Sequence, residues 1–198
     1  MSPLDNGERR TLLEIARRAV ILAVEKRARY RVDPVPPGNL SDPAGVFVTL
    51  RRGKHLRGCI GRLMTNEPLA QAVADAAKAS ALEDPRFSPV RREELAALEI
   101  EISVLSAFEK IDSAGIEVGK HGLLIERGNQ RGLLLPQVAS EYRWTAERFL
   151  NETCVKAGLR PDCWREPDTE IRGFTAEVFS SQELTEMKNG ADSESAPL

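Results

Sequence analysis

The sequence predicts an α+β protein in which two similar β/α units form one mostly antiparallel sheet with helices outside. Three observations support this prediction: an amphipathic helix opens the chain, a hairpin, a helix and a strand follow, and the same pattern then recurs. A hairpin joins neighbouring antiparallel strands, and each helix needs to bury an apolar face. Two such units can therefore join into one curved sheet with helices against it. Residue identity between the two halves is low, so the recurrence is one of pattern.

The first helix is predicted over residues 7–30. Its apolar residues recur at steps of three and four, while the arginines lie largely elsewhere; the apolar positions are Leu12, Ile15, Ala16, Ala19, Ala23 and Val24. Residues 33–45 form a loop rich in Pro, Gly and Asp, which ends the helix. Because this loop is long for a connector, we expect it to wrap the domain or to border a site.

The first unit follows this loop. Strands are predicted at 46–50 and 56–61 around a turn, a helix at 68–83, a turn-rich loop at 84–90, and a strand at 98–105. In the last of these, Leu98, Ile100, Ile102 and Val104 share one face, and Glu99, Glu101 and Ser103 share the other.

The second unit repeats the order of elements. Its hairpin is predicted from strands at 121–127 and 131–137, its helical stretch at 136–159 with a break near 143–145, and its closing strand at 171–179. We expect a single domain over 1–180, with larger and smaller subdomains as an option. The polar, acidic residues 181–198 predict a disordered tail.

The charge balance argues against nucleic-acid binding. The chain has 198 residues, a formal net charge of -2 and only 5% aromatic residues, whereas nucleic-acid binding usually needs clustered basic residues and stacking rings. Residues 51–57, RRGKHLR, are the best candidate for a local basic patch, and a charged hairpin tip is the alternative.

The cysteines and the hydropathy predict a cytoplasmic protein. No apolar leader opens the sequence, no apolar run approaches the length of a membrane span, and the thiols are expected to be reduced. Cys59, Cys154 and Cys163 fit no zinc spacing, so no metal site is predicted. Cys154 and Cys163 are interpreted as structural residues.

Residues 56–61, LRGCIG, raise the main functional question. The strand period places Arg57, Cys59 and Gly61 on one face, and the two glycines indicate close backbone approach, a bulge or a bend. Cys59 is either a small buried residue or a reactive thiol. Arg57 alone is too weak to activate it, because a unit charge about 7 Å away contributes about 0.6 kcal/mol in water.

Other residues are candidates for a site around Cys59. If both hairpins share one sheet, His121 can meet Cys59 and form the pair that nucleophilic catalysis requires, with Glu101 as orienting group, acid or base. A turn histidine and a solvated strand face are the alternatives. Arg86 in its turn, and Gln137 where a strand passes into a helix, are candidates for binding an anion. A local ion pair and an ordinary strand-to-helix junction are the alternatives there.

The motifs together resemble the AMMECR-domain family, named for a chromosomal region associated with Alport syndrome, midface hypoplasia and elliptocytosis. The matching segments are LRGCIG at 56–61, DPRF at 84–87, EIEISVLS at 99–106, GKHGLLIERG at 119–128, RGLLLPQVA at 131–139 and FLNETCVKAGL at 149–159. The resemblance implies two β/α repeats around one barrel-like sheet. It also implies an association of prokaryotic members with Memo-like and radical-SAM proteins in the AmmeMemoRadiSam system.

The resemblance implies no particular reaction. Our first hypothesis is an enzyme, or a component of an enzyme system, with a cleft around LRGCIG. Its catalytic candidates are Cys59, His121 and Glu101, and its ligand-binding candidates are Arg57, Gly58, Gly61, Arg86 and Gln137. The second is a non-catalytic module that binds a protein or a small ligand, and RNA binding is the least favoured. The sequence names no cofactor.

Overall fold

The computed structural model describes residues 2–182, which divide into two compact units. Unit 1 runs to Val104 and resumes at Glu177, and unit 2 is Leu105–Ala176. From residue 183 onwards, the predicted disordered tail lies outside the described residues.

Unit 1 contains two long helices, α1 (Asn6–Lys26) and α2 (Leu69–Leu82). A capping box begins α1, since the Asp5 carboxylate accepts the Glu8 N–H at 2.8 Å and the Asp5 N–H donates to Glu8 Oε2 at 3.0 Å. Arg27 adopts the left-handed conformation (φ 53°) and ends the helix. The predicted extension of this helix to residue 30 is therefore wrong.

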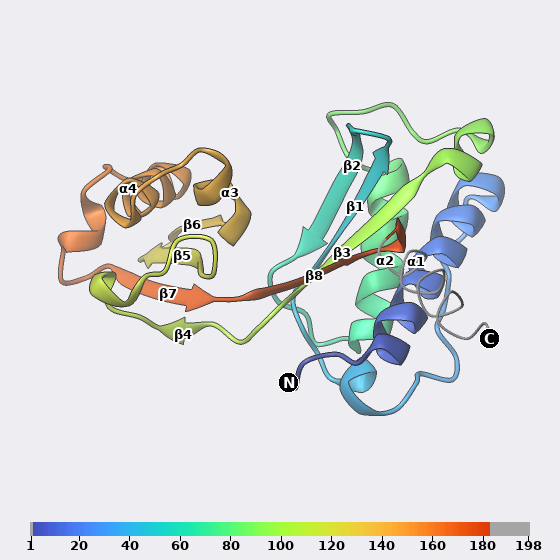
Figure 1. Ribbon diagram of the computed structural model, residues 1–198, viewed down its shortest axis with the longest axis horizontal. Helices are drawn as coiled ribbons and strands as arrows, with labels where there is room; N and C mark the ends of the chain where they lie inside the picture. Colours follow the sequence, from blue (N-terminus) through green and yellow to red (C-terminus); the bar gives the residue numbers. More distant parts are fainter. Residues whose placement is uncertain (1, 183–198) are drawn as a thin grey trace, which may run out of the picture. The chain divides into compact units, whose positions relative to one another are not determined.

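The sheet of unit 1 has the strand order β2-β1-β3-β8. Its strands are β1 (Val46–Arg52), β2 (His55–Arg62), β3 (Glu99–Leu105) and β8 (Ala176–Ser180). β1 runs antiparallel to both β2 and β3. One face is apolar and joins the core formed with α1 and α2, which lie together on one side of the sheet in Figure 1. The alternation predicted for β3 is confirmed, because Ile100, Ile102 and Val104 are buried.

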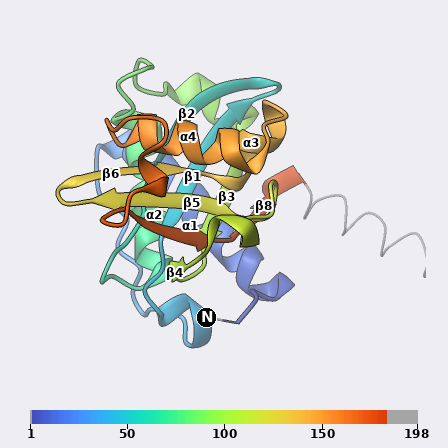
Figure 2. The same ribbon diagram turned by 90° about the vertical axis from the view of Figure 1, so that its left-hand side faces the viewer.

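Unit 2 has the strand order β4-β7-β5-β6. Its strands are β4 (Glu109–Lys110), β5 (Gly122–Arg127), β6 (Gln130–Leu134) and β7 (Glu170–Phe174). The helices α3 (Pro136–Glu141) and α4 (Ala146–Lys156) lie over one face of this sheet (Figure 2). The predicted helix break is confirmed: Arg143 has a φ of 52°, and the Thr145 hydroxyl then caps α4 by accepting the Arg148 N–H.

Short 3₁₀ turns complete the two units: η1 (Gly38–Ser41), η2 (Arg92–Ala97), η3 (Ser113–Gly115) and η4 (Cys163–Arg165). The longest helix of the described residues, α1, is continuous and carries charged residues along its length. Within residues 2–182, no helix is both long enough and apolar enough to cross a membrane.

The recurrence of hairpin, helix and strand is confirmed as topology, because β2-β1-β3 in unit 1 and β6-β5-β7 in unit 2 have the same order. The expected single barrel-like sheet is not confirmed. The described residues form two four-stranded sheets and no closed barrel.

The segment predicted as one strand at 171–179 is in fact two strands, β7 and β8, one in each sheet. Thr175 separates them, with its carbonyl accepting the Ser106 N–H at 2.9 Å.

The expected reduced state of all three thiols is also corrected. Cys154 and Cys163 form a disulfide that joins α4 to η4, and both are fully buried in the core of unit 2. The sequence spacing of nine residues carries no disulfide signal, because only the fold brings the end of α4 beside η4. Cys59 is the free cysteine.

Candidate functional site

The LRGCIG segment lies on β2, at the edge of the sheet of unit 1. The register pairs Leu50 with Gly58 and Arg51 with Leu56, which leaves Arg57 without a partner on β1. This extra residue is a β-bulge, one of the features that the glycines predicted. Strict alternation therefore fails at Arg57, so the strand period no longer supports the prediction that Arg57 and Cys59 share one face of β2.

The two glycines of the motif are required by close packing. A β-carbon on Gly58 would collide with the backbone carbonyl of Ser80 on α2, and a β-carbon on Gly61 would collide with the Val46 carbonyl and the Phe47 ring. The predicted close backbone approach is confirmed at both positions. Gly58 lets α2 lie directly on the hairpin.

Ser80 joins α2 to both strands of the hairpin, and the sequence analysis missed it. Its hydroxyl accepts the Ile60 N–H at 2.8 Å and donates to the Val48 carbonyl at 2.7 Å. Ser80 is 1% exposed. The available signal was a single serine among the alanines of the predicted helix 68–83, which follows a strand whose glycines indicated close backbone approach.

The DPRF loop closes the free edge of β2 at Cys59. The Asp84 carboxylate accepts the Cys59 N–H at 2.8 Å, and the Arg86 guanidinium donates to the Cys59 carbonyl at 3.2 Å. Arg86 also pairs with Asp84 at 2.7 Å. The hydrogen bond from Arg86 is the main reason that the pKa of Asp84, whose side chain is 2% exposed, lies well below its usual range. A further strand cannot add here, because both backbone groups of Cys59 are already bonded.

Arg57 is held by Glu94 of η2. Its guanidinium donates to both carboxylate oxygens, at 2.8 and 3.0 Å, and to the Ser88 carbonyl at 2.9 Å. The Glu94 carboxylate also accepts the Arg91 N–H at 2.9 Å. The Arg57 hydrogen bond lowers the pKa of Glu94 to about 2. Arg57 and Arg86 thus hold loops against β2, and a ligand-binding role for either stays a prediction.

The side chain of Cys59 lies in a polar row across three strands. Thr49 on β1 is in register with Cys59 on β2 and with Glu101 on β3. The Thr49 hydroxyl donates to Cys59 Sγ at 3.3 Å. Glu101 forms an ion pair with Arg51, in which Oε2 of Glu101 lies 3.8 Å from Nε of Arg51. The structure therefore places Cys59 and Glu101 on the same face of the sheet, on either side of Thr49.

The other two predicted residues belong to unit 2. His121 directly precedes β5, and its Nδ1 accepts the Glu117 N–H at 3.0 Å, which is the turn histidine given as the alternative. Gln137 is the second residue of α3, and its Oε1 is buried without a hydrogen-bond partner among residues 2–182. A pairing of His121 with Cys59, and anion binding by Gln137, stay predictions.

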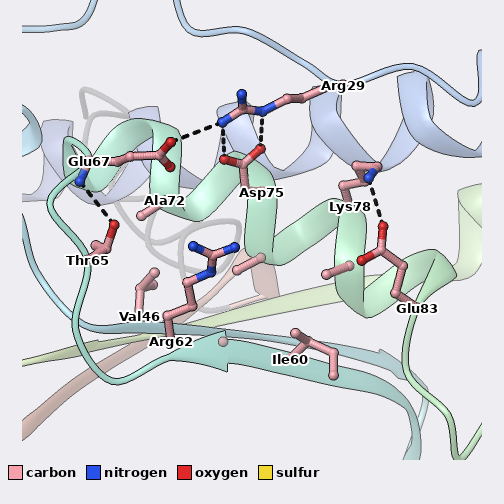
Figure 3. A pocket seen from close by; sticks show the side chains of 13 residues that line it. Arg29, Val46, Ile60, Arg62, Thr65, Glu67, Ala72, Asp75, Lys78 and Glu83 are labelled. Atoms are coloured by element: carbon pink, nitrogen blue, oxygen red, sulfur yellow. Dashed lines mark hydrogen bonds and ion pairs between the residues drawn. The ribbon is translucent and has the colours of Figure 1, made fainter.

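A groove between β2 and α2, with a volume of about 480 Å³, was not foreseen from the sequence. We define the groove by its apolar and charged lining. The apolar part consists of Val46, Ile60, Ala72, Ala76 and Ala79, and the charged part of Arg29, Arg62, Glu67, Asp75, Lys78 and Glu83. Figure 3 shows the helix α2 along one side and β2 along the other.

Most of the charges at the groove are paired. Arg29 Nε donates to Asp75 at 2.7 Å and its Nη2 reaches Glu67 at 3.3 Å, while Lys78 pairs with Glu83 at 2.7 Å. Arg62 rises from the end of β2 into the groove (Figure 3), and it has no ion-pair partner among residues 2–182.

Among residues 2–182, no group of three or more His, Cys, Asp or Glu side chains is arranged so that it could hold a metal ion.

Comparisons with known proteins agree on one family. The AMMECR1 family model matches residues 13–179. A protein of Methanothermobacter thermautotrophicus is 44% identical over 185 residues, which cover 90% of this chain and 96% of that protein. Protein TK0174 of Thermococcus kodakarensis is 45% identical over 182 residues, covering 86% of this chain and 89% of that protein.

A solved structure is similar as well. The crystal structure of the uncharacterized protein PH0010 from Pyrococcus horikoshii matches with a TM-score of 0.78 and 44% identity, over 85% of this chain and 89% of that one. The family model spans most of the chain, and the identity of these relatives is well above the level at which only a fold is shared. The chain therefore belongs to the AMMECR1 family.

Proposed function

We propose that this protein is a small-molecule-binding module whose ligand occupies the groove between β2 and α2. The groove carries this proposal: its volume of about 480 Å³ is in the range of small-molecule sites, and it combines an apolar lining with a few charged groups. Arg62 is the charged group that is available to bind a ligand, because the other charged side chains that line the groove form ion pairs within the described part of the chain.

The LRGCIG motif has a structural role in this proposal. Gly58 and Ser80 bring α2 onto the hairpin, and Asp84 and Arg86 fix the backbone of Cys59. Ile60 and Gly61 then form part of the groove wall. A rigid wall favours binding, because little conformational freedom is lost when the ligand enters.

The geometry supports binding better than cysteine catalysis. Cys59 alternates with Ile60, so its side chain is directed to the opposite face of the sheet from the groove. Within the described part of unit 1, the histidine is His55, which is paired with Arg52 at the far end of the hairpin. A histidine base for Cys59 would therefore have to come from outside unit 1.

A thiol-dependent reaction is the second candidate function, because the Thr49 hydroxyl donates to Cys59 Sγ at 3.3 Å. Alkylation by iodoacetamide near neutral pH tests this candidate. A rate above that of free cysteine, reduced in Thr49→Val, supports it; a thiol that reacts only after unfolding eliminates it.

The link to Memo-like and radical-SAM proteins also stays part of the proposal, as a set of partners that would supply or use the bound ligand. Co-purification of the tagged full chain with these proteins from one lysate tests the link.

A ligand screen tests the binding function. Ala79 lines the groove and is half-buried, so Ala79→Leu is expected to fill the space with little loss of stability. Compounds that raise the melting temperature of the wild-type protein should do the same for Cys59→Ser, and should lose their effect in Ala79→Leu. Compounds that stabilise Ala79→Leu as strongly as wild type would place the ligand outside the groove and contradict the proposal.

A further inference from the structure

A second cavity lies at the other end of the hairpin and shares no residue with the groove. This hollow has a volume of about 710 Å³ and is lined by Arg52, Arg57, Phe87, Ser88, Arg91, Glu93 and Glu94. Two of its arginines lie at the ends of elements: Arg52 is the last residue of β1, and Arg91 directly precedes η2.

The hollow carries an excess of positive charge. Arg57 and Glu94 neutralise each other through two hydrogen bonds, at 2.8 and 3.0 Å. Arg52 and Arg91 then contribute two positive charges against the single negative charge of Glu93, so one positive charge remains. Neither Arg52 nor Arg91 has an ion-pair partner in the described part of the chain. The basic segment 51–57 is thus more than a charged turn, because the fold brings Arg91 to it.

The wall of the hollow is held in place. Glu94 accepts the Arg91 N–H at 2.9 Å as well as both bonds from Arg57, and Arg57 also donates to the Ser88 carbonyl at 2.9 Å. These bonds connect β2, the loop after α2 and η2 around the hollow. The backbone position from which Arg91 extends is therefore set before any ligand arrives, and Arg52 extends from the last residue of β1.

We propose that the hollow binds a small phosphate monoester, with Arg52 and Arg91 bonded to the phosphate oxygens. A guanidinium presents two parallel N–H groups that match the geometry of phosphate oxygens. Two guanidinium groups carry two positive charges, so they match a phosphate dianion better than they match a singly charged carboxylate. Phe87 is half-buried at the same hollow, and the Arg86 guanidinium lies 5.5 Å from its ring. The ring contacts the organic part of the ligand.

The charge pattern favours a small molecule over a polynucleotide. Glu93 lies within the hollow, and the chain as a whole carries a formal net charge of -2. A polynucleotide needs a continuous row of basic residues that neutralises several phosphates, whereas Arg52 and Arg91 together neutralise one phosphate dianion.

Calorimetric titration with three probes tests the proposal: phenyl phosphate, inorganic phosphate and phenol. Phenyl phosphate should bind most tightly, inorganic phosphate more weakly, and phenol not at all. Arg52→Gln and Arg91→Gln should each weaken phenyl phosphate binding about tenfold or more, since each removes a charge-assisted pair. Phe87→Leu should reduce the advantage of phenyl phosphate over inorganic phosphate.

Arg92→Gln is the matched control, because Arg92 neighbours Arg91 but pairs with Glu25 at 3.1 Å and does not line the hollow. It should bind phenyl phosphate as wild type does. The proposal is wrong if Arg92→Gln weakens binding as much as Arg91→Gln, because equal effects would indicate general electrostatic attraction rather than a defined site. It is also wrong if phenyl phosphate shows no saturable binding below about 10 mM, or if only single-stranded RNA binds. Amide shifts of Phe87, Ser88, Val90 and Arg91 in NMR spectra report the site even where a variant is less stable.

Discussion

The backbone carbonyl of Ser80 on α2 lies against Gly58 of β2, in the space that a β-carbon on Gly58 would occupy. Because the obstacle is backbone within a helix, it cannot move aside as a flexible side chain would. The first glycine of LRGCIG is therefore a packing requirement, and the same contact brings the Ser80 hydroxyl to Ile60 and Val48.

Gly58→Ala is expected to lower the free energy of unfolding by about 3 kcal/mol, because the added methyl group forces α2 away from the hairpin. Chemical denaturation measures this loss. Gly115→Ala is the control: its β-carbon would meet Ile111 at 3.4 Å, an ordinary contact, and its stability should stay within about 0.5 kcal/mol of wild type. Equal losses in the two variants would contradict the packing role of Gly58.

Ser80→Ala is expected to lower the free energy of unfolding by about 2 kcal/mol. The change removes the hydroxyl that joins the Ile60 N–H to the Val48 carbonyl, and it leaves buried polar groups without that partner. Ser88→Ala, at an exposed position, should change stability by less than about 0.5 kcal/mol. Hydrogen exchange at Ile60 should also become faster in Ser80→Ala, and an unchanged rate would exclude the proposed bridge.

The Arg57–Glu94 pair predicts a specific dependence of stability on pH. The pKa of Glu94 is lowered from 4.5 to about 2 in the folded protein, chiefly by Arg57, and its side chain is 16% exposed. A lowered pKa stabilises the fold above the unfolded-state value, so this contribution is complete above about pH 5 and is lost as the pH falls toward 2. Its size is about 3 kcal/mol.

Glu94→Gln therefore should be less stable than wild type at pH 7, and the difference should shrink between pH 5 and pH 2. The free energy of unfolding of both proteins, measured at several pH values, gives this difference directly. Comparing the two proteins cancels the similar effect of Asp84, whose pKa is lowered in the same direction. A difference that is constant over this range would show that Glu94 acts without its charge.

The Cys154–Cys163 disulfide predicts one titratable thiol, that of Cys59, in the denatured and unreduced protein. Removal of the disulfide by reduction or by a double Cys→Ala change should lower stability by about 2–3 kcal/mol, from the entropy of a closed loop of about ten residues. The reductant should have no effect on the double variant. Three titratable thiols before reduction would contradict the disulfide.

Much of the secondary structure could be predicted from local patterns. The hairpin around residues 51–55, the helix at 68–83 and the break near Arg143 all follow from turn residues and apolar spacing, and the structure places them within one or two residues. The end of α1 was misjudged, because the left-handed conformation of Arg27 has no signal in a residue type that rarely adopts it.

Long-range pairing could not be predicted in the same way. The segment 171–179 has the pattern of a single strand, and nothing local to it shows that β7 and β8 join different sheets. Likewise, Arg57 stands near a cysteine in the sequence, and only the fold shows that Glu94, 37 residues away, pairs with it. Arg86 differs, because its pair with Asp84 lies within one turn and is the local ion pair that the sequence offered as the alternative.

The sequence by itself determined the α+β class, the recurring order of hairpin, helix and strand, the expectation of close packing at LRGCIG, and the family resemblance. These depend on residue spacing, on turn chemistry and on motifs that can be read within short segments. The tertiary structure decided that the sheets are two and that Cys154 binds Cys163. It also decided that Cys59 has a clamped backbone, with a groove on one side of its strand and Thr49 on the other. These depend on which distant segments meet, and that is set by the burial of whole apolar faces rather than by any local pattern.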